Sequence, residues 1–238
     1  MVSTVIKNWD NNTWLSSQDY IKSFNNFLIQ NIKLNSNSKI LDIGCGRGKI
    51  IGTLSSKLKL KFKPLGIDIV DHKDKDKRIN FKKVNASIYF SSNKDKFDLI
   101  LIKQTIHLLN TNKIKKLLSL SKKNLSQNGR ILIFTLDTHK NELPTFKLMK
   151  IKLMKSFKTD NKILSLITEL YPNRIIKKFN YRVKISKKKY LKMIQKKYIS
   201  ILLSMTMNEL SDGIEEINQK FNKILKFNDN LVCIIIKK

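Results

Sequence analysis

Three closely spaced glycines follow a short apolar stretch in residues 39–50, KILDIGCGRGKI. Residues 39–43 predict a β-strand and residues 48–59 predict a helix. The glycines therefore lie in a strand-to-helix turn, where their freedom to adopt positive φ lets the backbone approach a ligand closely. This succession of strand, tight turn and helix restricts the chain to folds in which a β-α unit opens a sheet.

The same alternation continues through the first half of the chain. Further strands are expected at residues 63–70, 79–84, 97–102 and 129–136, with a helix at 113–125. Repeated β-α-β order with short connections predicts an α/β fold, a doubly wound Rossmann-like sheet that is mostly parallel. Right-handed crossovers would then place a ligand crevice at the carboxyl ends of the strands. We expect about seven strands in total, the last of them antiparallel.

The two ends of the chain are expected to complete this sheet and to cover it. A helix is expected at about residues 18–33, with Ser17 as its N-cap. The segment after residue 137 is basic and mainly helical, and it is followed by a strand at 175–185, helices at 187–197 and 208–225, and a final strand at 230–237. No break in composition marks a second domain, so the sequence predicts one domain over residues 1–238.

The formal net charge is +30, from 48 basic and 18 acidic residues. A clustered basic face is typical of nucleic-acid binding. However, only five of the basic residues are Arg, the residue preferred for bidentate recognition of phosphates and bases. The chain also has a single alanine, Ala86, and is rich in Lys, Asn and Ile, as AT-rich codons produce. Codon bias is therefore favoured over a nucleic-acid partner, which stays open, and the charge should attract small anions.

Several other classes of protein are disfavoured by simple features. No stretch approaches the roughly 18 consecutive apolar residues of a membrane-spanning helix. The N-terminus lacks the apolar centre of a secretory signal. Cys45 and Cys233 belong to no CxxC pattern, so neither a disulfide framework nor a metal site is expected. The sequence predicts a cytoplasmic protein, monomeric or homodimeric, with no membrane partner.

The glycine turn departs from two familiar phosphate-binding patterns. The G-x-G-x-x-G pattern of NAD-binding turns is not met, because position 49 is Lys, and the P-loop pattern fails because Ile50 follows Gly48 and Lys49. Asp68 stands 24 residues after Gly44, near the carboxyl end of the second expected strand. A carboxylate there can accept hydrogen bonds from both hydroxyls of a ribose, and any adenosine cofactor supplies these.

Five motifs in order carry a resemblance to a known family. LDIGCGRG resembles the first motif of class I S-adenosylmethionine-dependent methyltransferases, and GIDI is similar to their second. VNASIYF stands where that family usually has Asp-Ala-x-x-x-Phe, and FDLILIKQTIHLL and NGRILIFTLD are similar to the fourth and fifth motifs. The ordered set covers about residues 39–137. Residues 196–205 also resemble, over a short stretch, the pocket-closing segment of the trans-aconitate and juvenile-hormone-acid branch.

The resemblance implies that S-adenosylmethionine is the cofactor and S-adenosylhomocysteine the product. Asp42 would hold the amino group of the cofactor, through a water or the turn backbone, and Asp68 would hold its ribose hydroxyls. Asn85 and Ala86 would meet the adenine edge, although relatives often have Asp at the Asn85 position. The remaining implied contacts are Gly44, Cys45, Gly46 and Gly48 beneath the methionine and ribose, Ile69 on the adenine, and Lys103 near the methionine.

The acceptor side is less clearly specified. Methyl transfer needs mainly alignment and exclusion of water, so the sequence need not show a general base. His107 and Gln104, just after the fourth strand, are the candidate catalytic residues, with a packing role for His107 as the alternative. His72 is expected at the surface of the charged loop 71–78. The candidate substrate-binding residues, each with a core or surface alternative, are Trp14, Tyr20, His139 and Tyr198, with Trp9 beside them.

These expectations define an organisation and a ranked set of functions. We expect a helical cap at residues 1–35, a cofactor-binding core at 36–137, a helical insertion over the acceptor pocket at 138–174, and C-terminal strands and helices at 175–238.

The first hypothesis for the function is methyl transfer to a small molecule, with a carboxylic acid as the first guess and sulfur or nitrogen acceptors open. An RNA or protein methyltransferase is less favoured, since no recognition module or N-P-P-[YF] motif is present. An aminopropyl transferase is disfavoured because basic and neutral residues follow the fourth strand.

Overall fold

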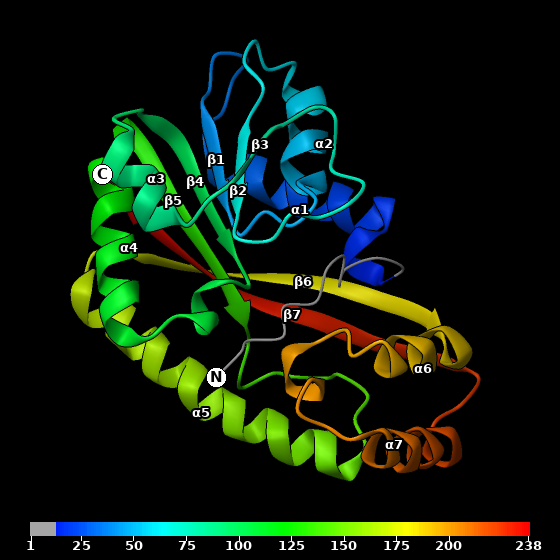
Figure 1. Cartoon of the computed structure of the whole chain (residues 1–238). Coiled ribbons are helices and arrows are strands. Elements are labelled where there is room, and N and C mark those ends of the chain that lie inside the picture. The colour runs from blue at the N-terminus through cyan, green and yellow to red at the C-terminus, as the bar shows by residue number, and fades with distance from the viewer. Residues whose placement is uncertain (1–12) are drawn as a thin grey trace.

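Seven strands form one sheet in this computed structural model, which describes residues 13–238 (Figure 1). The strands are β1 Ile40–Ile43, β2 Leu65–Asp68, β3 Asn80–Lys83, β4 Phe97–Lys103, β5 Leu125–Leu136, β6 Ile175–Ser186 and β7 Ile224–Lys237. Their order in space is β3-β2-β1-β4-β5-β7-β6. The first five pair in parallel, whereas β7 runs antiparallel to both β5 and β6. The predicted doubly wound sheet with an antiparallel last strand is therefore confirmed.

Helices cover both faces of the sheet. Figure 1 shows α1 (Gln18–Asn31) and α2 (Lys49–Leu58) on one side, and α3 (Ala86–Ser92) and α4 (Thr111–Lys123) on the other. The predicted N-cap of α1 is confirmed, since the Ser17 hydroxyl accepts a hydrogen bond from the Tyr20 backbone. The other helices are η1 Trp14–Ser16, η2 Ile106–Leu108, α5 Lys147–Leu170, α6 Lys187–Gln195, η3 Ser200–Leu202 and α7 Met207–Lys220.

The alternation of side chains along β4 builds two cores. Leu99 and Leu101 pack into one core with α1 and α2, whereas Ile100 and Ile102 pack into the other with α3 and α4. All four side chains are fully buried. A strand covered on both faces reads as a continuous apolar run, which is why FDLILI was recognisable from the sequence. The result is a rigid central strand whose carboxyl end, at Lys103, is held in place from both sides.

Two expected boundaries were wrong, both for the same reason. The last helix ends at Lys220 and β7 begins at Ile224, six residues before the expected start of the final strand. β5 likewise begins at Leu125, four residues early, where Leu125 pairs with Phe97 of β4. In each case pairing with a neighbouring strand prevailed over the local helical or polar pattern, because strand formation depends strongly on context.

The antiparallel pair of β6 and β7 extends beyond the rest of the sheet. β7 pairs with the end of β5 at Leu136 and Leu231, and it continues to pair with β6 from that point back to Ser186 and Ile224. The projecting half of this pair lies beyond the carboxyl end of β5, with α6 and α7 near its tip (Figure 1). It therefore adds a wall to the edge of the sheet at which the expected crevice lies. Among residues 13–238, no helix combines the length and apolarity needed to cross a membrane.

Candidate active site

The glycine turn between β1 and α2 has the left-handed backbone that its sequence predicts. Gly44, Gly46 and Gly48 have φ values of 73°, 54° and 70°. The backbone N–H of Gly44 donates to the Ile67 carbonyl of β2 at 2.8 Å, which draws the turn towards the neighbouring strand. A Cβ on Gly44 would lie 2.3 Å from the Thr105 hydroxyl, whereas a Cβ on Gly46 would meet no atom within 4 Å. The backbone at Gly46 thus lines an open surface, as close approach of a ligand requires.

Asp68, at the end of β2, is held rigidly beside this turn. Its Oδ2 accepts a hydrogen bond from the Gly46 N–H at 2.9 Å, and its Oδ1 accepts one from the Val70 N–H at 3.0 Å. Each carboxylate oxygen has further lone pairs, so both can accept additional donors. The neighbouring Ile69 is 59% exposed and is therefore accessible to a ligand. Asp68 thus offers a hydrogen-bond acceptor for hydroxyl groups, next to the exposed apolar side chain of Ile69.

Asp42, near the end of β1, is a buried carboxyl group in the same region. Only 4% of the residue is exposed. Burial raises the pKa of Asp42 to about 7, a rise that the Lys103 ammonium opposes and the Asp68 carboxylate increases. A cation placed against this group would stabilise its ionised form. The position is therefore suited to a positively charged ligand group.

Lys103 and Gln104 stand at the carboxyl end of β4, between the two cores. The Lys103 ammonium donates to the Gln104 side-chain oxygen at 3.3 Å, and it lies 5.4 Å from the centre of the Tyr20 ring and 5.5 Å from that of Phe24. Gln104 has a φ of 51°, which is rare for a residue other than Gly, Asn or Asp. Such strain is typical of functional sites and marks the point where the chain leaves the sheet.

The residues expected at the adenine edge begin α3. The Asn85 side-chain oxygen accepts a hydrogen bond from the Ser87 N–H at 2.8 Å and so caps the helix. Asn85 is otherwise exposed, and Ala86 is half-buried behind it. Because the side-chain oxygen of Asn85 caps the helix, the N–H groups of its side-chain amide are the donors available to a ligand. Asn can thus present a hydrogen-bond donor where relatives often have a carboxylate.

The three histidines lie in different surroundings. His107 is half-buried in η2, and burial lowers its pKa, which favours the neutral imidazole. His139 is exposed, and its backbone N–H donates to Asp137 at 3.1 Å. The expectation that His72 lies at the surface was wrong: its side chain is 3% exposed, and its Nε2 lies 3.8 Å from Asp68 Oδ2. His72 was missed because the surrounding charges, DHKDKDKR, indicate a solvated loop.

Three of the expected substrate residues come together around a carboxylate that the sequence did not reveal. The Trp14 Nε1–H donates to Asp229 of β7 at 3.0 Å, and the Trp14 ring packs edge-on against Tyr198 at 5.6 Å. Burial, and next the charge of Asp229, raises the pKa of Tyr20. The Tyr198 hydroxyl bonds with that of Tyr190. All of these side chains are buried. Trp9, which was expected beside them, lies outside the described residues.

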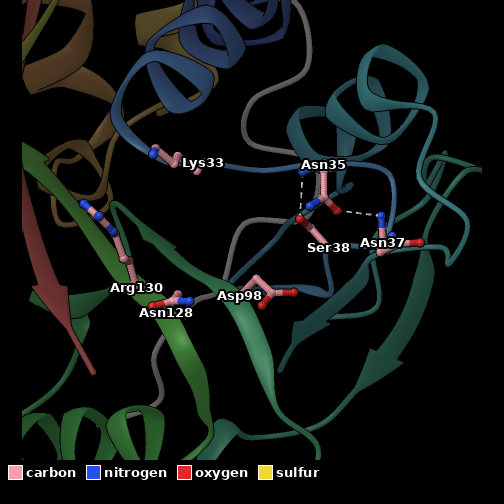
Figure 2. Close-up of a pocket in the computed structure, with 7 residues that line it drawn as sticks. All are labelled: Lys33, Asn35, Asn37, Ser38, Asp98, Asn128 and Arg130. Carbon is pink, nitrogen blue, oxygen red and sulfur yellow. Dashed lines mark hydrogen bonds between the residues drawn. The ribbon is translucent and has the colours of Figure 1, made fainter.

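A cleft of about 630 Å³ lies at the opposite ends of the strands. Figure 2 shows its lining around Asp98, whose carboxylate accepts hydrogen bonds from the Lys39 backbone N–H and the Ser126 hydroxyl. Asp98 and Lys39 mark the amino ends of β4 and β1, so this cleft is separated from Asp42 and Lys103 by the length of the sheet. Its lining residues are Lys33, Asn35, Asn37, Ser38, Asp98, Asn128 and Arg130. None of the sequence-predicted site residues belongs to it.

Comparison with known proteins gives one family match and many similar folds. The model of a family described as a methyltransferase domain matches residues 17–184. A putative methyltransferase from an antibiotic biosynthesis pathway of Anabaena variabilis is 14% identical with a TM-score of 0.63, and the match covers 89% of this chain and 95% of that one. A SAM-dependent methyltransferase from Archaeoglobus fulgidus is 22% identical with a TM-score of 0.54, covering 93% and 95%.

A third solved structure is the plantazolicin methyltransferase in complex with a desmethylPZN analog and SAH. It is 17% identical with a TM-score of 0.54, and the match covers 97% of this chain and 88% of that one. At such identities the three structures show a shared fold. No curated protein matches this chain in sequence.

Proposed function

The chain belongs to the methyltransferase-domain family, and we propose that it transfers a methyl group from S-adenosylmethionine to a small-molecule carboxylic acid. When bound, the cofactor supplies a methyl group already activated by its sulfonium. The protein therefore has to bind the cofactor, align the acceptor with the methyl group and exclude water. Of the similar structures, one is a SAM-dependent methyltransferase and another is a complex with SAH, which supports the same cofactor here.

The residues at the carboxyl ends of β1 and β2 suit this cofactor. Asp68, with both oxygens oriented by backbone N–H groups, would accept from the ribose hydroxyls, and Ile69 would contact the adenine. Asp42 would pair with the methionine ammonium. Asn85, whose oxygen caps α3, would turn its amide nitrogen towards the adenine ring. The open backbone at Gly46 leaves room for the ribose and methionine between them.

The observation that carries the acceptor proposal is a pair of donors beside the end of β4. The Tyr20 hydroxyl is fully buried, and among the described residues it interacts with the Asp229 carboxylate without a well-formed hydrogen bond. The Lys103 ammonium lies 5.4 Å from the centre of the same ring. A buried donor and a cation together suit a carboxylate, which accepts charge-assisted hydrogen bonds from both. A carboxylate is also nucleophilic without a general base, so His107 and Gln104 need only orient it or exclude water.

Lys103→Met should raise the KM for a carboxylic acid acceptor by about 10- to 100-fold, the loss expected for one charge-assisted hydrogen bond. The measurement is initial-rate kinetics at a pH well above 7, where Asp42 stays ionised without the help of Lys103. Lys103→Arg, which keeps the cation, is the matched control and should recover most of the affinity. An unchanged KM, or an enzyme product methylated on nitrogen or sulfur, would exclude the carboxylate as acceptor.

Binding of S-adenosylmethionine should weaken as the pH falls below about 7, because Asp42 has a pKa of about 7. The free protein holds the proton below that pH, whereas the methionine ammonium favours the ionised carboxylate, so binding expels one proton. The apparent Kd should then rise by about tenfold per pH unit on the acid side. Calorimetry over this pH range measures how the Kd depends on pH, and this dependence should be much weaker in Asp42→Asn. A slope that persists in Asp42→Asn would assign the proton to another group.

We further propose that the enzyme acts in the cytoplasm on a metabolite rather than on nucleic acid, with residues 138–174 covering the acceptor. The preponderance of Lys over Arg supports a charge set by codon usage. A methyltransferase acting on RNA would need the basic surface, and its binding would fall steeply with salt. Transfer to the small molecule should instead depend weakly on salt.

A further inference from the structure

We propose that His72 is a positioning residue for the Asp68 carboxylate, and this rests on the proposed role of Asp68 in cofactor binding. Residues 69–79 connect β2 to the parallel β3 without a helix, although parallel strands are usually joined through one. The connection therefore cannot be held by the packing of an apolar helical face. Its own side chains have to fix its path past the cofactor site.

His72 is the residue of the charged segment 71–78 that turns fully inward. Its side chain is 3% exposed, while Asp71 and Lys73 on either side are exposed. Lys75 secures this arrangement: its ammonium donates to the His72 carbonyl at 3.0 Å, pairs with Asp71, and lies 4.7 Å from the centre of the Phe81 ring of β3. The contacts of Lys75 within the loop thus hold the His72 side chain in its inward position.

The loop also contacts the glycine turn, through a backbone hydrogen bond. The Asp76 N–H donates to the Arg47 carbonyl at 2.9 Å, and the Gly46 N–H donates to Asp68 Oδ2 at 2.9 Å. The turn is therefore bonded both to the loop, at Asp76, and to the end of β2, at Asp68. A shift of the loop would move the turn, and with it Gly46 relative to the carboxylate offered to the ribose.

The His72 imidazole lies directly against this carboxylate. The distance of 3.8 Å between His72 Nε2 and Asp68 Oδ2 is too long for a direct hydrogen bond. It is short enough for the ring to occupy the space into which the carboxylate could otherwise turn, and for its polar N–H to stabilise the negative charge. Both side chains are largely buried, with Asp68 at 12% exposed, so water screens the interaction little. His72 would thus hold Asp68 in the orientation that the ribose needs.

A double-mutant cycle tests whether His72 acts through Asp68. We expect His72→Ala to raise the Kd for S-adenosylmethionine about tenfold, within the range of coupling energies for residues in contact. In an Asp68→Asn background the same change should alter the Kd by less than about twofold. The turnover number at saturating cofactor and acceptor should stay at the wild-type value. His72→Gln, which keeps a polar N–H of similar reach, should recover most of the affinity.

Lys73→Ala, an exposed neighbour in the same loop, is the matched control and should leave the Kd unchanged. Equal losses from His72→Ala in both backgrounds would overturn the proposal, because they would show a general effect on the loop. So would an unchanged Kd in a His72→Ala protein that melts at the wild-type temperature. If the wild-type protein itself bound no S-adenosylmethionine, the proposed function would fail, and that result is separable from the other two.

Discussion

Asp68→Ala should weaken binding of S-adenosylmethionine by about 100- to 1000-fold. The side chain is expected to accept hydrogen bonds from two ribose hydroxyls, and hydrogen bonds to a charged group contribute about 1.5–3 kcal/mol each. A loss of about 3–4 kcal/mol corresponds to this factor in Kd. Isothermal calorimetry or equilibrium dialysis with labelled cofactor measures it. No other single substitution in the described site is expected to reduce cofactor affinity as much.

Two further variants separate binding from folding. Asp68 also accepts from the Gly46 and Val70 backbones, so its removal leaves both donors unpaired and lowers stability. Asp68→Asn keeps an acceptor oxygen for one of them and should still lose most of the affinity. Asp74→Asn removes an exposed carboxylate of the same loop and suits its left-handed backbone (φ 57°), so this variant should bind cofactor normally. If Asp74→Asn lost as much affinity as Asp68→Ala, the general charge of the loop would be responsible, and the assignment of Asp68 would be wrong.

Gly44→Ala should destabilise the protein by about 2–5 kcal/mol. Gly44 has a φ of 73°, and a Cβ there would lie 2.3 Å from the Thr105 hydroxyl and 2.9 Å from its Cβ. A left-handed backbone in a residue other than Gly costs about 1–2 kcal/mol, and overpacking adds about 1–3 kcal/mol. The turn and the end of β4 would have to separate, which also disrupts the cofactor site. Urea denaturation measures the change in the free energy of unfolding.

Gly46→Ala is the matched comparison. Its φ of 54° is also left-handed, but the added Cβ would meet no atom within 4 Å. The cost should be the backbone term alone, about 1–2 kcal/mol. If both variants lost the same stability, contact with Thr105 would contribute nothing, and the close approach of the turn to β4 would not be a constraint on the sequence.

The arrangement of the residues proposed to bind the cofactor could be predicted because they follow one another along the chain. Asp42 and the glycines stand within a single turn, and Asp68 ends the next strand, so their relation is set by a local β-α-β unit. The order of the central strands follows from the same regularity. An apolar run such as FDLILI also predicts its own burial on both faces. Each of these signals can be read within a short window of sequence.

The acceptor half could not be predicted in the same way, because its parts come from distant segments. Asp229 meets Trp14 across 215 positions of sequence, on an antiparallel strand pair that projects beyond the rest of the sheet. Nothing local in ILKFND, residues 224–229, distinguishes the start of a long strand from the end of a helix. His72 is hidden among charges, and only the folded loop shows that it points inward.

The carboxylates of the site stand out against the composition of the chain. With 48 basic and 18 acidic residues, the chain is strongly positive overall. Yet Asp42 and Asp68 are buried or largely buried at the carboxyl ends of β1 and β2, close enough for their charges to interact. Burying a carboxylate is costly, so such a pair indicates a function that needs negative charge. A cofactor that carries a sulfonium and an ammonium group would meet that need.

Transfer of label from methyl-labelled S-adenosylmethionine by the wild-type protein tests the central claim most directly. The protein is incubated with the labelled cofactor and a metabolite extract, and the small-molecule, RNA and protein fractions are then separated. We expect label in a low-molecular-mass product that alkaline hydrolysis releases as methanol, as a methyl ester requires, and none from Asp68→Ala. Label confined to RNA or protein, or no transfer and no binding of the cofactor, would contradict the account.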